Sequence, residues 1–323
     1  MSSPTLQALV YNLRHEATGI VSVELRPVAP ATAFPVVEAG AHIDLHLGNG
    51  LVRSYSLTNP GESHRCVVAV LNDRHSRGGS RYVHEQLRVG QVIPIGAPRN
   101  HFRLQEDAPR SVLLAGGIGV TPVFAMFQRL AALHRPAHLI YCARSRAEAA
   151  FVGEIEALVR AHPMLSLHAH FDDEQGRPPQ LLTLLDGHAA DTHFYACGPA
   201  PMLEAYERAC AQLGQGHVHL ERFAAGAPVA DTSAAVGYSV ELRKSGKTVQ
   251  VAPGVVLLDA LLNAGVALDH SCREGVCGAC ETKVIAGDVE HRDLILTEQE
   301  RAANKSMMIC VSRCRAGHLV LDA

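Results

Sequence analysis

The stretch that decides the fold of this 323-residue chain is Cys272-Arg273-Glu274-Gly275-Val276-Cys277-Gly278-Ala279-Cys280, and Cys310 follows it after 29 intervening residues. Three thiols therefore come from one tight loop, and a fourth comes from elsewhere in the chain. The two glycines inside the loop let the backbone wrap closely around a bound group. This spacing is the plant-type pattern of [2Fe–2S] ligands. We therefore predict a [2Fe–2S] cluster on Cys272, Cys277, Cys280 and Cys310.

Two other interpretations of the cysteines are a structural zinc site and scattered core residues. Zinc sites usually contain two paired Cys-x2-Cys knuckles or histidines at fixed spacing. Here there is one such pair, and neither His270 nor His291 completes a second. The odd total of nine cysteines does not suggest a disulfide framework. Cys314 is interpreted as a bystander. Three more cysteines are interpreted as small buried apolar residues: Cys66, Cys142 and Cys210.

The overall composition excludes several classes of protein. Lys and Arg number 29 and Asp and Glu 32, which gives a net charge of −3. No nucleic-acid partner is expected, because such a partner requires a basic face. No apolar stretch reaches the roughly 18–20 residues that a membrane span needs, and residues 1–10 do not resemble a signal peptide. We therefore expect a cytoplasmic protein, and since nothing requires an oligomer, a monomer.

The pattern along the chain predicts three domains and a linker. Residues 1–107 are short alternating runs, which predict an antiparallel β-barrel. Residues 108–226 alternate strands and helices, which predicts an α/β domain with a parallel sheet. Pro122 is expected at the first position of a helix in this domain. Residues 227–236 are small and aperiodic, and predict a linker. Residues 237–323 predict an α+β plant-type ferredoxin domain of the β-grasp type.

The first domain carries a pattern that suits a flavin. Alternation along Arg53-Ser54-Tyr55-Ser56-Leu57 places Arg53, Tyr55 and Leu57 on one face and the two serines on the other. An arginine can pair with a phosphate, a tyrosine can lie against a flavin ring, and a serine can reach a ring nitrogen. The turn at Gly78-Gly79-Ser80 offers bare N–H groups to an anion. Alone, each motif is more simply a solvated strand or a plain turn, but together they indicate a flavin site.

The second domain carries glycine-containing turns at two strand-to-helix junctions. Gly116, Gly117 and Gly119 let the backbone approach a pyrophosphate, although the stretch is not the Gly-x-Gly-x-x-Gly fingerprint. Cys197-Gly198-Pro199 follows another strand of the same sheet. Two such junctions at the carboxyl ends of parallel strands predict a crevice for a nicotinamide dinucleotide. Arg144-Ser145-Arg146 follows the second strand and could hold a 2′-phosphate, but a solvated loop is the preferred interpretation.

With these motifs in place, the whole chain resembles the phthalate dioxygenase reductase family, and especially its vanillate O-demethylase reductase branch. That family places an FMN-binding barrel first, a nicotinamide domain second and a plant-type ferredoxin domain last. The resemblance rests on the following stretches: 39–44, 53–57, 77–80, 98–102, 116–122, 197–199, 221–223, the cysteine motif and 319–322.

The resemblance implies FMN, NADH and a [2Fe–2S] cluster as cofactors. It places the FMN phosphate on Gly78, Gly79 and Ser80. The flavin ring would contact Arg53, Tyr55, Ser56, Leu57, Val70, Leu71, Asn72 and Thr121, with Phe223 covering it on the nicotinamide side. The nucleotide would contact Gly116, Gly117, Gly119, Arg144, Ser145, Cys197, Gly198 and Pro199. The partner that the resemblance implies is a Rieske-type oxygenase.

The three centres imply an order of electron transfer. NADH gives up two electrons at once, a [2Fe–2S] cluster accepts one at a time, and a flavin can do both. The expected path therefore runs from NADH through FMN to the cluster, and then to the oxygenase. Ser56 near the flavin N5 and Cys197 near the nicotinamide C4 are the candidate catalytic residues, on motif position alone.

Two alternative functions remain open at this point. One is a reductase for another acceptor, such as a cytochrome. The other is a ferredoxin-like carrier or sensor without flavin activity, against which the intact motifs in all three domains argue. A self-contained oxygenase would need a Rieske or haem motif, which the sequence lacks.

Overall fold

The computed structural model describes residues 5–29, 31–74, 76–224, 236–315 and 317–323. They form two compact units, which divide between Phe223 and Ala224. The expected barrel and α/β domain both lie in the first unit, and the expected ferredoxin domain lies in the second. Except for Val236, the expected linker at 227–236 falls outside the described residues.

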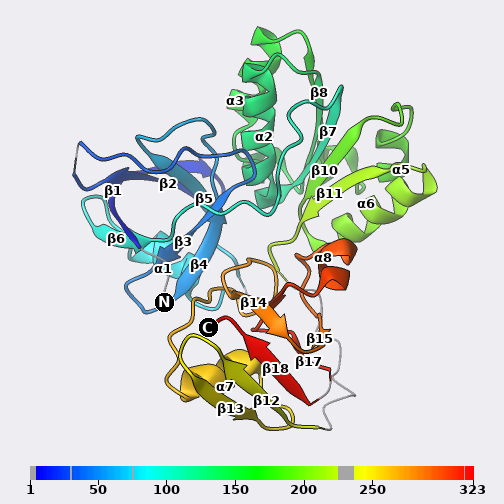
Figure 1. The fold of residues 1–323 in the computed structure, drawn as a ribbon. Coiled ribbons are helices and arrows are strands. Elements are labelled where there is room, and N and C mark those ends of the chain that lie inside the picture. Colours follow the sequence, from blue (N-terminus) through cyan, green and yellow to red (C-terminus); the bar gives the residue numbers. More distant parts are fainter. Residues whose placement is uncertain (1–4, 30, 75, 225–235, 316) are drawn as a thin grey trace. The chain divides into compact units, whose positions relative to one another are not determined.

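The first unit opens with a six-stranded antiparallel sheet (Figure 1). In the order of pairing, its strands are β4 (Val52–Ser56), β3 (His42–His46), β6 (Val92–Ile95), β1 (Leu6–Ala17), β2 (Ile20–Pro27) and β5 (Cys66–Leu71). A bridge between Leu57 and Val68 joins the two ends of this order. The sheet therefore closes into the antiparallel barrel that the sequence predicts.

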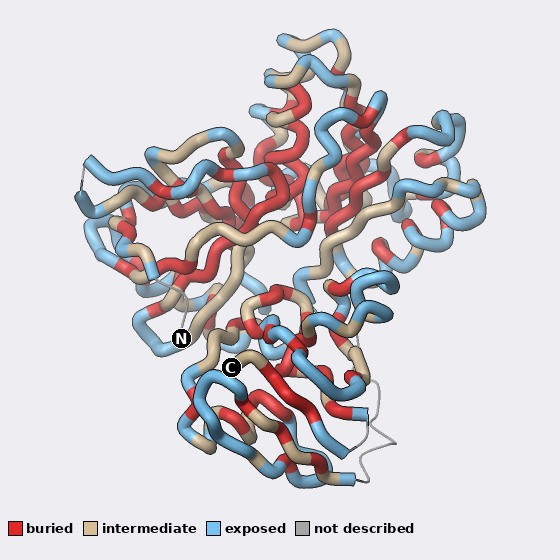
Figure 2. Tube along the Cα trace, in the orientation of Figure 1, coloured by how far each residue is buried: buried red, intermediate tan, exposed pale blue. Residues whose placement is uncertain are grey.

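The barrel is filled by apolar residues that recur at every second position of its strands. In β5, Cys66, Val68 and Val70 are buried, and Val68 lies opposite Val23 of β2. Figure 2 shows the buried trace following the strands, whereas many of the connecting loops are exposed. Helix α1 (Gly79–Glu85) packs beside β5, where its His84 ring hydrogen-bonds to the Val70 carbonyl over 2.9 Å. This contact holds the Gly78–Ser80 turn against the barrel.

The second part of the first unit is a five-stranded parallel sheet. Its strands, in order, are β11 (His217–Glu221), β10 (His193–Cys197), β7 (Ser111–Gly116), β8 (Ala137–Ala143) and β9 (Leu165–Phe171). The connections contain α2 (Val120–Ala132), α3 (Val152–Ala161), α4 (Asp172–Gln175), α5 (Leu181–Leu184) and α6 (Ala200–Gln212), with 3-10 turns at Gly117–Gly119 and Arg146–Glu148. Every residue of β7 is buried, as a central parallel strand covered on both faces requires.

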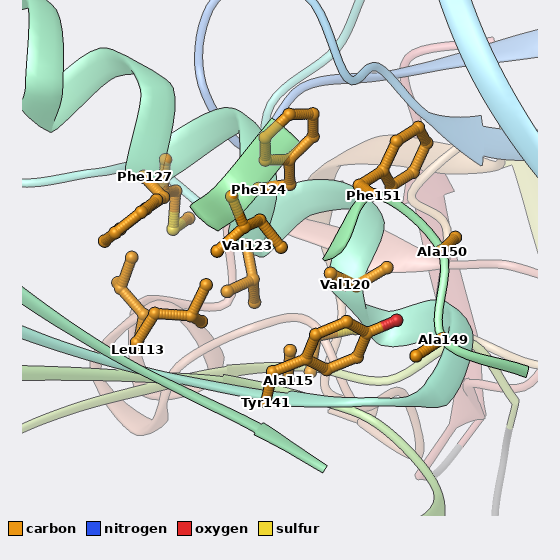
Figure 3. Packing of buried hydrophobic residues seen from close by; sticks show 14 of the residues in the cluster. Leu113, Ala115, Val120, Val123, Phe124, Phe127, Tyr141, Ala149, Ala150 and Phe151 are labelled. Carbon is orange, nitrogen blue, oxygen red and sulfur yellow. The ribbon is translucent and has the colours of Figure 1, made fainter. Parts of the chain in front are cut away.

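The barrel and the parallel sheet share one core. Figure 3 shows apolar residues of α2, Val123 and Phe124 among them, packed over Leu113 of the sheet. The rings of Phe124 and Phe151 stack with their centroids 5.0 Å apart, an arrangement worth about 0.5–1.5 kcal/mol beyond the buried area. Five barrel residues belong to the same cluster: Ala17, Ile20, Ala39, Ala69 and Phe102. The two sheets are therefore joined by buried apolar contacts.

The helix after β7 begins earlier than the sequence predicts. A 3-10 turn comes first and α2 starts at Val120, so Pro122 is its third residue, and the expectation of a first position is wrong. The missing N–H is tolerated because the first four N–H groups of a helix have no partner within it. The Thr121 hydroxyl donates to the Ile118 carbonyl over 3.0 Å, which satisfies the oxygen that an N–H at position 122 would otherwise reach.

The second unit is a mixed five-stranded sheet with two short helices. Its strands, in order, are β13 (Lys247–Val251), β12 (Tyr238–Leu242), β18 (His318–Leu321), β14 (Glu281–Ala286) and β16 (Ser306–Met308). A small ladder pairs β15 (Val289–Glu290) with β17 (Arg313–Cys314). Helix α7 (Leu257–Asn263) buries three leucines in the core, and α8 (Glu298–Ala303) begins with a capping box between Thr297 and Glu300. This is the predicted α+β architecture.

Within the residues that the structure describes, no helix has the length and apolar character needed to cross a membrane. The longest helices in this part of the chain, α2 and α6, contain 13 residues each.

Candidate functional site

The four predicted ligand cysteines meet in the second unit. Cys272, Cys277 and Cys280 lie on the loop between α7 and β14, and Cys310 follows β16. The Cys272 side chain forms hydrogen bonds with Cys277 and Cys310, and Cys280 forms one with Cys310. The fold therefore joins the three loop cysteines and the distant cysteine in one group, in which Cys272 and Cys280 contact Cys310 and Cys277 contacts Cys272.

Backbone N–H groups of the loop point at these sulfurs. The Glu274 N–H donates to Cys272 Sγ over 3.3 Å, and the Cys272 N–H donates to Cys277 Sγ over 3.4 Å. The curl that aims them depends on Gly275, whose φ is 70° and where a Cβ would lie only 2.7 Å from Val311. N–H groups directed at sulfur stabilise thiolates and tune the potential of a bound cluster.

The contacts among the four sulfurs shift the pKa values of the cysteines in opposite directions. Hydrogen bonds from Cys277 and Cys310 lower the pKa of Cys272, and the bond with Cys310 lowers that of Cys280. The same contacts raise the pKa values of Cys277 and Cys310. Within the described residues, no three His, Cys, Asp or Glu side chains converge on a single ion. Four soft sulfur donors suit a [2Fe–2S] cluster, which divides four thiolates between two irons.

The remaining cysteines lie in apolar surroundings. Cys314 is buried in the core of the second unit and lies opposite Val289 in the β15–β17 ladder. Burial raises the pKa of Cys66 and of Cys142 to about 12, and that of Cys210 to about 11. Because the thiolate is the reactive form, these three residues behave as small apolar side chains.

Arg53 lies directly over the turn that begins α1. A Cβ built on Gly79 would come within 2.5 Å of Arg53 Cγ and 2.9 Å of its Nε, so only glycine permits this approach. Gly78 has a φ of 97°, which also favours glycine. The Ser80 hydroxyl accepts a hydrogen bond from the Asp73 N–H over 3.3 Å. Arg53 of β4 and the predicted phosphate turn are thus brought together from separate segments.

The residues after Arg53 lead from the surface of the barrel into its interior. Tyr55 is partly buried, and burial raises its pKa to about 12 against the opposing charge of Arg53. Leu57 is fully buried in the barrel core. On β5, Val70 is buried and Leu71 partly buried, and Asn72 donates its N–H to the Gly19 carbonyl.

Glycines interlock the two strand-to-helix junctions of the parallel sheet. A Cβ on Gly119 would lie 2.2 Å from the Cys197 carbonyl oxygen, and a Cβ on Gly198 would lie 3.1 Å from the Cα of Gly116. A Cβ on Gly116 would lie 2.8 Å from Pro199 Cδ. Gly117 is different, because its φ is 53° and no atom lies within 4 Å of where its Cβ would stand. The junctions therefore close on each other and leave the surroundings of Gly117 open.

A buried carboxyl group lies where the barrel meets the parallel sheet. Glu221, at the end of β11, is the register partner of Cys197, and its carboxyl group is hydrogen-bonded to the Ser56 hydroxyl. His42 Nδ1 lies 4.0 Å from Glu221 Oε1. Glu221 Oε2 is buried and has no hydrogen-bond partner in the described part of the chain. Such an orphaned polar atom fits the edge of a ligand site.

Burial sets the protonation of this group of residues. It raises the pKa of Glu221 to about 8, in spite of the opposing hydrogen bond from Ser56. It also raises the pKa of Cys197 well above its usual value. At neutral pH, Glu221 and Cys197 therefore both carry protons.

The two remaining residues predicted to contact the flavin differ in exposure: Thr121 is buried, whereas Phe223 is 42% exposed.

Both arginines after β8 have carboxylate partners. Arg144 Nε lies 2.8 Å from Glu148 Oε2, and Arg146 Nε lies 3.1 Å from Glu174 Oε1. The Arg146 guanidinium also lies over the Phe171 ring, 4.5 Å from its centroid. Ser145 precedes the 3-10 turn and accepts the Glu148 N–H at its carbonyl. Both arginine side chains remain largely exposed, 72% for Arg144 and 55% for Arg146, so the loop is both solvated and ion-paired.

Sequence reasoning missed two residues of this site, Glu221 and His42. Both stand inside stretches that carry the family resemblance, but neither has a role that spacing alone suggests. Their proximity to Ser56 depends on two pairings: His42 lies opposite Ser56 between β3 and β4, and Cys197 lies beside Glu221 between β10 and β11. β11 itself was not predicted. A short strand with Val218 and Leu220 before Glu221 was the available signal.

Two family models match this chain. A 2Fe-2S iron-sulfur cluster binding domain matches residues 240–315, and an oxidoreductase NAD-binding domain matches residues 113–208. The two matches fall on the second unit and on the parallel sheet of the first.

Several known proteins are similar over the whole chain. Phenoxybenzoate dioxygenase subunit beta of Ectopseudomonas oleovorans is 45% identical, over 97% of this chain and 96% of that protein. Vanillate O-demethylase oxidoreductase of Pseudomonas sp. (strain HR199 / DSM 7063) is 40% identical, over 98% of this chain and 99% of that protein.

Two solved structures extend the comparison. Phthalate dioxygenase reductase, described as a modular structure for electron transfer from pyridine nucleotides to [2Fe-2S], superimposes with a TM-score of 0.70 at 30% identity, covering 99% of this chain and 98% of that one. An intact type IV self-sufficient cytochrome P450 monooxygenase superimposes with a TM-score of 0.89 at 39% identity. The match covers all of this chain and 42% of that protein.

Proposed function

Because this chain belongs to the phthalate dioxygenase reductase family, we propose that it is the reductase component of an oxygenase system, passing electrons from NADH through FMN to a [2Fe–2S] cluster and on to the oxygenase. The observation that carries the proposal is the contact group of four cysteine sulfurs within a chain that also holds a nucleotide-binding sheet. When bound, the flavin takes two electrons from NADH and releases them singly, as a [2Fe–2S] cluster requires.

The barrel supplies the flavin site in this proposal. Arg53, Gly78, Gly79 and Ser80 hold the phosphate, which the close approach of Arg53 to Gly79 supports. An arginine fork suits a phosphate because it can form two parallel charge-assisted hydrogen bonds. Tyr55, Ser56, Leu57, Val70, Leu71, Asn72 and Thr121 border the flavin ring, and the half-exposed Phe223 covers it.

The parallel sheet supplies the nucleotide site. Gly116, Gly117, Gly119, Gly198 and Pro199 shape the crevice, and the open surroundings of Gly117 support backbone approach to a pyrophosphate. Arg144 and Ser145 lie at the end of the second strand of the sheet, where the adenosine ribose of a dinucleotide binds. The carboxylate partner of Arg144 supports NADH as the nucleotide, because a 2′-phosphate would have to displace or repel it.

Ser56 and Cys197 are the proposed catalytic residues. Their support is that Ser56 is hydrogen-bonded to Glu221, which lies beside Cys197, so both residues reach the place where barrel and sheet meet. The neutral Cys197 thiol and the Ser56 hydroxyl can each present a hydrogen-bond donor without adding charge. Glu221, protonated at neutral pH, sets the orientation of the Ser56 hydroxyl.

The proposed partner is a Rieske-type oxygenase. Its support is that relatives are named as parts of oxygenase systems, including a phenoxybenzoate dioxygenase and a tert-butanol monooxygenase. A cytochrome is the second candidate acceptor, favoured by the superposition on a self-sufficient cytochrome P450. We further propose a monomer in the cytoplasm, where reducing conditions keep the ligand thiols free.

The proposal includes the domain boundaries 1–107, 108–226, 227–236 and 237–323. They are supported by the gaps between Ile95 and Ser111 and between Glu221 and Tyr238, which contain no strand or helix in the described residues. The boundary between residues 226 and 227 is further supported by the division of the chain between Phe223 and Ala224.

Reduction of two candidate acceptors in parallel tests the proposed partner. The reconstituted chain, NADH, and either a purified Rieske-type oxygenase component or a purified P450 haem domain are mixed without oxygen, and acceptor reduction is followed by absorbance. Faster reduction of the Rieske component supports the proposal. Reduction of the P450 haem domain but not of the Rieske component would instead identify a cytochrome as the acceptor.

A further inference from the structure

A buried carboxylate connects the two parts of the cysteine ligand set. The Asp293 side chain is 0% exposed, although it belongs to no strand or helix. Its Oδ2 accepts hydrogen bonds from the N–H groups of Ile295, over 3.2 Å, and Leu296, over 2.8 Å. These bonds fold the segment after β15 into a tight turn within the second unit.

On one side, this turn holds the loop that carries the first three cysteines. The Leu294 N–H donates to the Gly275 carbonyl over 2.9 Å. A Cβ at Gly275 would stand 3.0 Å from the Cα of Asp293 and 3.3 Å from its Cβ. Asp293 therefore packs directly on the middle of the cysteine loop, between Cys272 and Cys277.

On the other side, the same carboxylate reaches the segment of the fourth cysteine. The Ser312 hydroxyl, two residues after Cys310, donates to Asp293 Oδ1 over 3.5 Å. The same hydroxyl accepts the Arg292 N–H over 3.1 Å. Asp293 is thus linked both to the loop that carries Cys272 and Cys277 and to the segment after β16 that carries Cys310.

The charge of Asp293 is only partly balanced. Arg301 Nη2 lies 3.8 Å from its Oδ2, and the Arg301 side chain is 36% exposed to solvent. His291 Nδ1 lies 3.7 Å from Oδ1 and is buried. In an interior of low dielectric, a buried carboxylate packed against the ligand loop of a redox centre acts on each electron added to that centre.

We infer that Asp293 is a positioning residue that fixes the two parts of the cysteine ligand set against each other, and that its buried negative charge lowers the reduction potential of the bound cluster. This rests on the proposed function, because it requires a [2Fe–2S] cluster on the four cysteines. A negative charge opposes the gain of an electron, so a neutral side chain of the same shape favours the reduced cluster.

The test is the midpoint potential of the reconstituted full-length chain with Asp293→Asn. Asparagine keeps an oxygen for the Ile295 and Leu296 N–H groups but removes the charge. At a fixed potential, the ratio of reduced to oxidised cluster is expected to rise about tenfold, which is 59 mV for a one-electron couple. The matched control is Asp288→Asn, which changes a 68% exposed carboxylate paired with Arg315 just before β15 and is expected to leave the midpoint unchanged.

Ser312→Ala separates positioning from charge. It removes a link to the Cys310 segment but no charge, so it should speed loss of the cluster to a chelator without moving the midpoint. Asp293→Asn should do both. If Asp293→Asn does not accumulate as folded protein, Arg301→Gln is measured instead. Removal of the neighbouring positive charge should shift the midpoint in the opposite direction.

The outcomes separate this inference from the proposed function. Failure of the unsubstituted chain to take up iron and sulfide would contradict the proposed function. If the unsubstituted chain takes up the cluster normally but Asp293→Asn has the same midpoint potential, the inference alone is contradicted. The same holds for Arg301→Gln where that variant replaces Asp293→Asn. If Asp288→Asn shifted the midpoint potential as much as Asp293→Asn does, the inference would also be contradicted, because the effect would then not be specific to Asp293.

Discussion

The Ser56 hydroxyl and the Glu221 carboxyl group are joined by a hydrogen bond, although 164 residues separate them in the chain. Ser56 ends β4 of the barrel, and Glu221 ends β11 of the parallel sheet. The bond thus crosses from the predicted flavin domain to the predicted nucleotide domain. It lies beside Cys197, where we propose that the flavin and the nicotinamide meet.

Ser56→Ala should slow reduction of bound flavin by NADH about tenfold, a loss near 1.4 kcal/mol. The reason is that Glu221, protonated at neutral pH, can donate to the Ser56 oxygen, which leaves the Ser56 hydroxyl proton to donate toward the flavin in our proposal. Stopped-flow absorbance under anaerobic conditions measures the rate. Ser54→Ala is the matched control, because the Ser54 hydroxyl donates to Asp44 within the barrel. A change below about threefold for Ser56→Ala would remove Ser56 from the catalytic residues.

Glu221→Gln should flatten the dependence of stability on pH. The pKa of Glu221 is raised to about 8 in the folded chain, against 4.5 for the ordinary group. Between these values the unfolded chain has lost the proton while the folded chain keeps it. Stability therefore falls as pH rises through this window, by about 1.4 kcal/mol per pH unit from this group.

Denaturant unfolding at pH 5 and pH 8 checks this prediction. The glutamine variant should match the unsubstituted chain more closely at pH 5 and exceed it in stability at pH 8. Glu156→Gln, at a carboxylate that is 45% exposed on α3, is the control and should leave the pH dependence unchanged. A parallel pH dependence for Glu221→Gln and the unsubstituted chain would show that Glu221 is ionised at neutral pH.

Cys310→Ser should abolish stable cluster binding, because it removes one of four thiolates and serine is a harder, weaker donor to iron. Cys314→Ser is a close control, since Cys314 lies four residues further on, is also buried, and faces the apolar core. It should retain full iron and sulfide content with a modest loss of stability. Loss of the cluster in Cys314→Ser but not in Cys310→Ser would reverse the assignment.

Removal of the carboxylates that pair with Arg144 and Arg146, just after β8, should relax the preference for NADH over NADPH. Glu148 pairs with Arg144, and Glu174 pairs with Arg146. In the double variant Glu148→Gln with Glu174→Gln, both guanidinium groups are released for a 2′-phosphate. We expect kcat/KM for NADPH to rise about tenfold, near 1.4 kcal/mol, with little change for NADH. Unaltered NADPH kinetics would place the adenosine site away from this loop.

The fold was predictable wherever local pattern and spacing determine it. Gly116 to Gly119 marked the turn between β7 and α2, and the cysteine spacing marked the loop of the second unit. The antiparallel barrel and the parallel sheet followed from alternation and from strand–helix rhythm. The start of α2 was wrong by two residues, because the first turn of a helix tolerates proline at any of its positions.

The candidate site was predictable only in part, because strand pairing decides which side chains meet. Ser56 and Cys197 could be selected from motifs. Glu221 became visible only through its register with Cys197 and its contact with Ser56. Asp293 likewise carries no motif, and its place depends on the turn that folds it against Gly275.

The most direct test of the central claim is the visible absorption spectrum of the anaerobic chain, loaded with FMN, iron and sulfide, before and after NADH is added. We expect combined flavin and [2Fe–2S] absorption, both parts of which bleach rapidly with NADH. A chain that holds the cluster but binds no FMN, with cluster absorption unmoved by NADH, would contradict the account and leave a ferredoxin-like carrier or sensor.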